Sequence, residues 1–427
     1  MSASLLWLLA FVVLLFLGLP VSVAIGLAAC LAILIAQPFL LNTVPSMMVG
    51  SLDSFLLVAI PLFMLAGNLM ERGGASRRIF DFASSVSGWM KGGLGAVNVV
   101  ASMIFGGISG SSVADAAGLG PIEINAMTAR GYPKDYSAAI TVASSTLAVV
   151  IPPSILMVIY AIAANQSVGG CLLAGLLPGI TIGLGMILCN YVISRRHGWG
   201  ADVPFSFRNI LREGRRSFWA LLTPLVLLFG VLSGFFTPTE AAGVSVLYVL
   251  IISILIYREM RGREILSVLR QVVSGIGSAV LIVCTASLAA YLLTVEKVPQ
   301  QVAFFLVETV KKPWLILLVI NLFLLVVGMF MDATSAVIIL TPLLLPVIRS
   351  IGMSPIHFGV MMVANLAIGL VTPPVGVCLF VTCSVARISM EDLTRAVLPF
   401  YLSLIASLLL ITYLPWLSLA LPRLFGF

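Results

Sequence analysis

Long apolar runs follow one another along the whole chain, and they restrict what it can fold into. A helix needs roughly 17–25 apolar residues to cross a bilayer, and runs of this length recur from one end of the sequence to the other. Only 9% of the 427 residues are charged, against about 25% in soluble domains. These two observations exclude a cytosolic enzyme and predict an all-α polytopic membrane protein.

Two of the apolar stretches differ from the others because small and polar residues interrupt them midway. They are 92–130, interrupted at 106–112, and 313–350, interrupted at 328–335. Irregular backbone is tolerated at membrane depth only where it is buried in protein or lines a cavity. We therefore predict two re-entrant helical hairpins with tips inside the membrane. The remaining runs are predicted to be crossing helices at 4–19, 20–36, 54–71, 135–163, 170–193, 218–236, 239–257, 271–293, 356–382 and 398–421.

The basic residues predict an orientation for these helices. With both hairpins re-entrant, 18 of the 23 Lys and Arg residues fall on one side of the membrane and five on the other. Cytoplasmic loops carry an excess of Lys and Arg, so this side is predicted to be cytoplasmic and both termini periplasmic. The net charge of +7 then reflects topology, and no nucleic acid is expected as a partner. The segments 76–91 and 297–312 are amphipathic and are expected to lie at the interface as arm helices.

Glycines and prolines repeat at a constant offset of 221 residues. Gly107 matches Gly328, and Pro152-Pro153 matches Pro373-Pro374. Each half then holds five crossing helices and one hairpin, and because five is odd the second half is inverted. Inverted repeats with broken helices are typical of secondary transporters. The predicted parts are 1–193 (hairpin 92–130), a basic cytoplasmic linker at 194–217, and 218–427 (hairpin 313–350).

Each half contributes a hairpin tip and a helix broken at a double proline. Two adjacent prolines remove two N–H donors and leave carbonyl oxygens without helical partners. Carbonyl and hydroxyl oxygens suit a hard cation such as Na⁺, so each half can form one cation site. The N-terminal ends of the second hairpin helices suit an anionic group of the substrate.

Acidic residues near the tips are the other candidates. An aspartate at membrane depth is costly unless it is paired or functional, which singles out Asp332 and Asp115. The alternative for each is a capping role at a helix start. Glu240 is expected to cap a helix, and Glu123 is expected to lie in solvent near a segment end.

The sequence leaves three alternative functions to compare with a secondary transporter. Gly107-Ile108-Ser109-Gly110 matches the GxSG pattern of intramembrane serine proteases, but neither His197 nor His357 is placed to act as its base. A channel needs a continuous pore and has little use for two matched hairpins. An H⁺-coupled organic-anion transporter of the same architecture stays open, with Asp332 or Asp115 as the titrating group.

Three motifs together resemble the large membrane subunit of TRAP (tripartite ATP-independent periplasmic) transporters. They are Gly107-Ile-Ser-Gly-Ser-Ser-Val-Ala-Asp115, Phe236-Thr-Pro-Thr-Glu-Ala-Ala242 and Val371-Thr-Pro-Pro374. The resemblance implies a bacterial inner-membrane protein without enzymatic activity, in which a transport domain slides against a scaffold as an elevator. It also implies a separate four-helix membrane subunit, a periplasmic solute-binding protein and Na⁺-driven uptake of an organic acid, such as a C4-dicarboxylate or sialic acid. No organic cofactor is expected.

The same resemblance assigns residues to the two Na⁺ sites and to the substrate. The first Na⁺ site would use Ser109, Ser111 and carbonyls around Ala148, Ile151 and Pro153. The second would use Gly328, Gly369, Thr372 and a carbonyl near Val375. Ala148 stands where the family has a glycine, which does not matter if only its carbonyl binds. The substrate is expected to contact Asp332, Asp115, Ser112 and Thr334.

Overall fold

The computed structural model describes residues 3–53 and 55–427, and this part of the chain forms helices and turns without a strand. The all-α prediction is therefore confirmed. The first part contains α1 (Ala3–Phe16), α2 (Val21–Ala36), α3 (Val44–Gly50), α4 (Ala59–Arg72) and α5 (Ala75–Ser87), with short 3-10 turns at Pro38–Thr43 and Phe55–Val58.

The first predicted hairpin and the first proline-broken helix follow. The hairpin comprises α6 (Gly93–Ser109), α7 (Ser112–Gly118) and α8 (Gly120–Ala129). The broken helix comprises α9 (Lys134–Ser144), a 3-10 turn at Ser145–Val149 and α10 (Ile155–Ala164), and α11 (Val168–His197) ends this half.

The remaining helices belong to the second half of the sequence. Its helices are α12 (Phe207–Leu232), α13 (Pro238–Ile251, extended by a π turn at Ile252–Ile256), α14 (Gly262–Val295), α15 (Val298–Val310), α16 (Pro313–Phe330), α17 (Ala333–Ser350), α18 (Pro355–Gly369), α19 (Val377–Ala386), α20 (Met390–Tyr413) and α21 (Pro415–Leu424). Shifting the bounds of α6 by 221 residues gives 314–330, which matches α16. The inversion of the halves stays a prediction.

Several boundaries differ from the sequence prediction. Both hairpin interruptions are narrower than expected, because only Gly110–Ser111 and Met331–Asp332 leave the helical conformation. The predicted helix 398–421 is divided at Leu414, where Pro415 cannot donate the next helical hydrogen bond. Helix α12 begins at Phe207, inside the predicted linker, and α3 was not predicted.

Length and composition support a membrane location. Seven helices in the described residues have at least 18 residues and enough apolar character to cross a bilayer, and six shorter helices are also apolar. Both α16 and α17 are among the seven, so the re-entrant second hairpin stays a prediction. Helix α14 has 34 residues and extends for about 51 Å.

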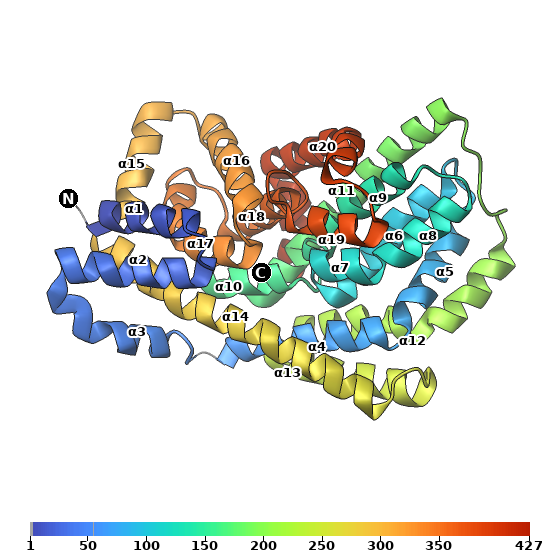
Figure 1. Cartoon of the computed structure of the whole chain (residues 1–427), viewed down its shortest axis with the longest axis horizontal. Coiled ribbons are helices and arrows are strands. Elements are labelled where there is room, and N and C mark those ends of the chain that lie inside the picture. Colours follow the sequence, from blue (N-terminus) through green and yellow to red (C-terminus); the bar gives the residue numbers. More distant parts are fainter. Residues whose placement is uncertain (1–2, 54) are drawn as a thin grey trace.

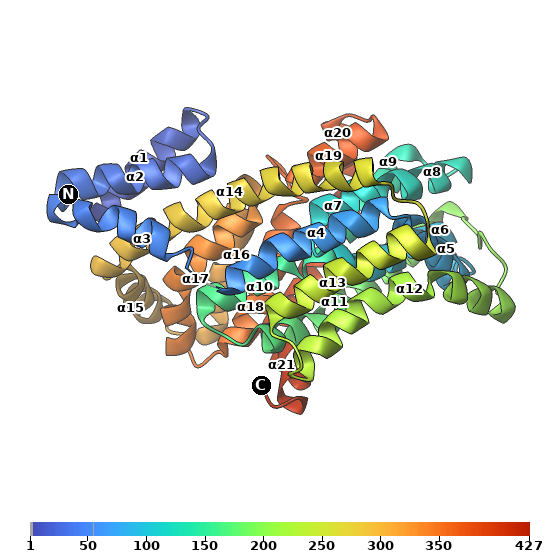
Figure 2. The ribbon, with the colours of Figure 1, turned by 90° about the horizontal axis from the view of Figure 1, so that it is seen from below.

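The long helix α14 lies beside a group formed by the hairpins and the proline-broken helices. Helix α14 runs along one side of the molecule, where it packs on α2, α4 and α17 (Figures 1 and 2). Toward the middle of Figure 1, α16 packs on α18 and α9 packs on α20. The tips of the two hairpins lie within this group, beside α4 and α10.

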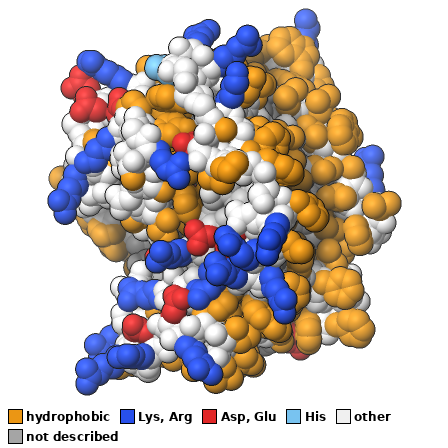
Figure 3. Space-filling view, turned by 90° about the vertical axis from the view of Figure 1, so that its right-hand side faces the viewer, with side chains coloured by type: hydrophobic (Ala, Val, Ile, Leu, Met, Phe, Trp, Pro, Cys, Tyr) orange, Lys and Arg blue, Asp and Glu red, His pale blue; other side chains and the backbone are white. Residues whose placement is uncertain are grey.

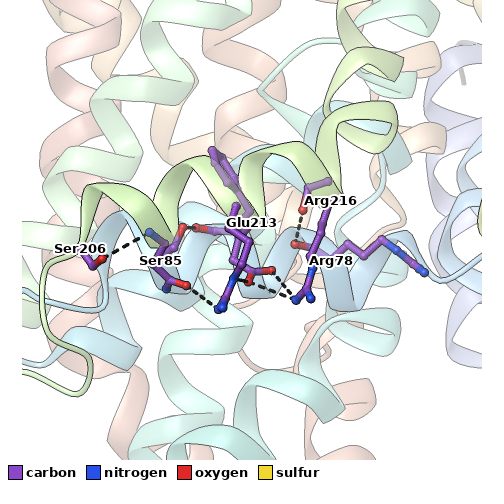
Figure 4. A network of polar contacts seen from close by, with 9 residues as sticks. Arg78, Ser85, Ser206, Glu213 and Arg216 are labelled. Atoms are coloured by element: carbon purple, nitrogen blue, oxygen red, sulfur yellow. Dashed lines mark hydrogen bonds and ion pairs between the residues drawn. The ribbon is translucent and has the colours of Figure 1, made fainter.

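Basic side chains gather at the end of the molecule where α5, α8 and the start of α12 lie (Figure 3). Glu213, only 7% exposed, accepts from Arg212 at 2.8 Å and from Arg216 at 3.3 Å. The Ser217 hydroxyl donates to the carbonyl of Arg78 at 2.7 Å, which attaches α12 to α5 (Figure 4). Arg78 in turn pairs with Glu259 at 2.7 Å. This network fixes α5, the predicted arm, against α12.

Candidate functional site: two hairpin tips around one cavity

The tip of the first hairpin lies directly against the first proline-broken segment. A Cβ atom on Gly106 would be 2.5 Å from the Cα of Ala148, and one on Gly110 would be 2.9 Å from the carbonyl oxygen of Pro153. Gly110 also has φ +61°, a conformation that L side chains rarely adopt. Glycines are therefore required at this contact, which places the carbonyl of Pro153 beside the tip.

The serines of this tip have oxygen atoms with spare acceptor capacity. Ser111 caps α7, and its hydroxyl oxygen accepts from the N–H of Ala114 at 3.4 Å. The hydroxyl oxygen of Ser109 accepts from the N–H of Ser111, also at 3.4 Å. Both bonds are long for hydrogen bonds to oxygen, and Ser109 is 3% exposed. A cation can compete for both oxygens here.

The second tip meets the second broken segment in the same way. A Cβ atom on Gly369 would be 2.5 Å from the carbonyl carbon of Gly328 and 2.8 Å from its oxygen. The N–H of Val375 donates to the carbonyl of Met329 at 3.3 Å. The Thr372 hydroxyl donates to the carbonyl of Ile368 at 2.6 Å, so its oxygen lone pairs remain available to another ligand.

One cavity of about 180 Å³ joins the two tips. Its wall contains Ser109 to Ala114 from the first hairpin and Asp332 to Thr334 from the second. The proline-broken segments and helix α4 complete it through Val149, Ile155, Leu156, Leu370, Val377, Met64, Gly67 and Asn68.

Asp332 caps the start of α17, which was the alternative to a functional role, and it also lines the cavity. One of its carboxylate oxygens accepts from the N–H groups of Thr334 at 3.0 Å and Ser335 at 3.2 Å. These are donors at the start of α17, so they are not free to bind a substrate carboxylate. The expectation of an open anion site at this helix end is therefore wrong. At the first hairpin, the N–H groups of Ser112 and Val113 have no partner among the described residues.

The structure brings most of the predicted site residues together. Ser109, Ser111, Ser112, Asp332 and Thr334 line the cavity. Ala148, Ile151 and Pro153 lie on the segment behind the first tip, and Gly328, Gly369, Thr372 and Val375 lie around the second. Asp115 does not line the cavity; it is fully buried and accepts a hydrogen bond from Ser102 at 2.8 Å.

Two residues with a place in this site were missed from the sequence. Asn68 of α4 lines the cavity, and an amide within an apolar stretch was a signal for it. Its neighbour Gly67 lets α4 approach, since a Cβ there would be 3.1 Å from the Cα of Ser109. Glu123 of α8 was expected to lie in solvent, and this expectation is wrong, because its side chain is completely buried.

Glu240 and the two histidines lie outside the cavity. Glu240 forms a capping box with Thr237, as expected. The His357 ring contacts the carbonyl of Ile411 at 2.8 Å, and the exposed His197 contacts that of Ile193 at 3.0 Å. Both rings contact main-chain carbonyls far from Ser109 in the sequence, so neither histidine is paired with the serine of the GxSG pattern.

Comparison with known proteins agrees with this architecture. Residues 8–417 match the family model described as "Tripartite ATP-independent periplasmic transporter, DctM component". The chain belongs to this family. It is 39% identical over 403 residues to the C4-dicarboxylate TRAP transporter large permease protein DctM of Pseudomonas aeruginosa, which covers 94% of each chain. It is 37% identical over 412 residues to the sialic acid TRAP transporter large permease protein SiaM of Vibrio cholerae, which covers 96% of each.

A solved structure shares the fold at lower identity. The crystal structure of the Alcanivorax borkumensis YdaH transporter matches with a TM-score of 0.63 and 16% identity, over 99% of both chains. The family model and the two relatives described above identify the chain as a large permease of the TRAP family.

Proposed function

We propose that this chain is the permease subunit of a Na⁺-driven tripartite transporter that takes up a small organic acid. The observation that supports it is the single cavity, which both hairpin tips and both proline-broken segments line. Binding sites of secondary transporters form where discontinuous helices from two repeats meet. The names of the relatives, which include C4-dicarboxylate and sialic acid permeases, agree with an acid as substrate.

Each Na⁺ would be held where a tip touches its broken segment. At the first tip, the ligands would be the hydroxyl oxygens of Ser109 and Ser111 and carbonyls of the Ala148–Pro153 segment, whose backbone approaches Gly106 and Gly110 closely. At the second, the Thr372 hydroxyl and the carbonyls of Gly328, Gly369 and Val375 supply the oxygens. Oxygen-only ligands suit a hard monovalent cation, and each ion would hold a tip closed on its segment.

The substrate would occupy the cavity between the tips. Its volume of about 180 Å³ is below the roughly 300–1,000 Å³ of common ligand pockets, which favours a small acid over a bulky sugar acid. The free N–H groups of Ser112 and Val113 suit a carboxylate, and the Thr334 hydroxyl and the Asn68 amide can bind its polar atoms. The Asp332 carboxylate would accept from a substrate hydroxyl, and the second acid group of a dicarboxylate would lie away from Asp332 because the two charges repel.

The transport step would be an elevator movement. The two hairpins and the broken helices pack on one another, and they would move together past α4, α13 and α14, of which α4 contacts the other two. The basic end would face the cytoplasm. A small membrane subunit would pack on the N-terminal helices and 218–293, and a periplasmic binding protein would dock at the opposite end, including the turn at 237–240.

The experiment is a thermal-stability measurement on the solubilised full chain with its co-purified partner, in Na⁺ and in K⁺ at fixed ionic strength. A ligand at about 100 times its dissociation constant adds roughly 2.7 kcal/mol. We expect Na⁺ alone to stabilise the wild type, and Ser109→Ala and Thr372→Ala each to reduce the effect. Equal stability of the wild type in both salts would contradict Na⁺ coupling and favour the H⁺-coupled alternative.

A further inference from the structure

The interior of the first hairpin contains six polar side chains that the cavity does not use. They come from four helices, and each is fully buried with no exposed surface: Asn98 and Ser102 of α6, Asp115 of α7, Glu123 of α8, and Thr141 and Ser144 of α9. None of them lines the cavity between the tips. This group, which we call the hairpin-1 polar core, lies inside the element that the proposed mechanism moves.

Four of these side chains form a connected chain of hydrogen bonds that ends on Asp115. The Asn98 amide donates to the Thr141 hydroxyl at 2.6 Å, and the Ser144 hydroxyl donates to the Asn98 amide oxygen at 2.8 Å. The Ser102 hydroxyl lies 3.1 Å from that of Ser144 and donates to one oxygen of Asp115 at 2.8 Å. The network therefore supplies a hydrogen bond to only one of the four carboxylate oxygens of Asp115 and Glu123.

Three carboxylate oxygens of the polar core lack a hydrogen bond of good geometry. They are both oxygens of Glu123 and the second oxygen of Asp115. The two carboxylates interact electrostatically, and the Thr141 hydroxyl makes only a marginal hydrogen bond to Glu123. No ion pair in the described part of the chain involves either residue. Glu71 of α4 and Cys378 of α19 are the other titratable groups that interact with Asp115, and neither supplies positive charge.

A buried carboxylate without a partner is strongly destabilising in protein or lipid. We propose that the hairpin-1 polar core is a third cation site, separate from the two tip sites, with Na⁺ held by Asp115, Glu123 and Thr141. One Na⁺ would compensate one of the two negative charges and bind to open carboxylate oxygens, and a single proton on the other carboxyl group would compensate the second charge. Carboxylate, hydroxyl and amide oxygens are the ligands that hard cations take, and Ser102 and Ser144 orient Asp115.

This site would act on the tip through one short helix. Helix α7 carries Ser111 at its start and Asp115 one turn later, and the N–H of Asp115 donates to the carbonyl of Ser111 at 3.0 Å. An ion on Asp115 would hold α7 in place and thereby position Ser111 at the first tip. The inference rests on the proposed Na⁺ coupling.

The test is the number of ²²Na⁺ ions bound per chain at saturation, measured by equilibrium dialysis on the full chain with its co-purified partner. We expect three ions for the wild type, and two for Glu123→Gln and for Asp115→Asn. Thr372→Ala, a tip variant, should also bind two, and the double variant with Glu123→Gln should bind one. The matched control is Glu391→Gln, since Glu391 pairs with Arg395 and is 73% exposed, and it should bind three.

Thermal stability in K⁺ separates loss of the site from misfolding. Glu123→Gln replaces an unpaired charge by a neutral amide of the same shape, so it should unfold at a higher temperature than the wild type without Na⁺. If Glu123→Gln binds as many ions as the wild type, the third site is refuted, and a loss with Thr372→Ala would still support the tip sites. If the wild type binds no Na⁺, both this site and the proposed coupling fail.

Discussion

The backbone contact between Gly328 and Gly369 predicts the effect of adding one methyl group at the second tip. In Gly369→Ala, the new Cβ would be 2.5 Å from two backbone atoms of Gly328. Non-bonded carbons prefer about 3.5–4.0 Å, so the tip and the broken segment must separate by about 1 Å. Overpacking of this kind costs about 1–3 kcal/mol. Because the contact belongs to the proposed second Na⁺ site, that cost would fall on the ion-bound state.

The same cost can be expressed as a loss of Na⁺ affinity. Since 1.4 kcal/mol is a factor of ten, about 1–3 kcal/mol corresponds to a roughly 5- to 150-fold weaker affinity. At a Na⁺ concentration about 100 times the wild-type dissociation constant, the stabilisation of roughly 2.7 kcal/mol would fall to about 0.4 kcal/mol for a 100-fold loss. The assay is a Na⁺ titration of unfolding temperature in a K⁺ background.

Gly277→Ala is the control for this prediction. Gly277 lies in α14, and a Cβ there would meet no atom within 4 Å, so alanine should stabilise the helix by up to about 1 kcal/mol. Its Na⁺ titration should match that of the wild type. The reasoning is refuted if Gly369→Ala titrates with the wild-type midpoint, or if Gly277→Ala is weakened equally.

Two further predictions concern capping carboxylates. Asp332→Asn keeps an N-cap side chain for α17, so its free energy of unfolding should lie within about 0.5 kcal/mol of the wild-type value, while Asp332→Ala should lose about 1 kcal/mol. If the Asp332 charge acts on the substrate, both variants should impair uptake. Normal uptake by Asp332→Asn would show that Asp332 only caps α17. Burial opposes ionisation of Glu296, but hydrogen bonds from Ala3, Ser4 and Gln37 outweigh it and lower its pKa. Because the folded pKa is below the ordinary value of about 4.3, the stabilisation is complete above that pH and is lost as the pH falls through the folded pKa. The unfolding-temperature gap between wild type and Glu296→Gln should therefore close in acid, and a constant gap would contradict this.

The parts of the site that depend on local backbone chemistry could be predicted from the sequence. A double proline ends helical hydrogen bonding wherever it stands, so the breaks at Pro152-Pro153 and Pro373-Pro374 were found, and the small residues at the tips identified the hairpins. The predicted interruptions were too wide because glycine also occurs inside helices. Gly106 and Gly328 stay helical, and their missing side chains admit the opposite backbone.

The parts that depend on which helix face is covered could not be predicted. Glu123 lies near the end of an apolar stretch, where a solvated position is the ordinary expectation, yet α7 and α9 pack on α8 and remove it from water. The place of Asn68 in the cavity wall could not be predicted, because the sequence does not show that α4 approaches the first tip. The role of Asp332 was left between capping and function, and only its hydrogen bonds to Thr334 and Ser335 show that it caps α17.

We propose that a Na⁺ gradient drives an acid into the cavity between the two tips. It is tested most directly by uptake of radiolabelled small dicarboxylates into proteoliposomes that contain the complete transporter with its binding protein. We expect uptake with an inward Na⁺ gradient, its loss when K⁺ replaces Na⁺, and its reduction in Ser109→Ala and Thr372→Ala. Equal uptake driven by a proton gradient in the absence of Na⁺ would contradict it.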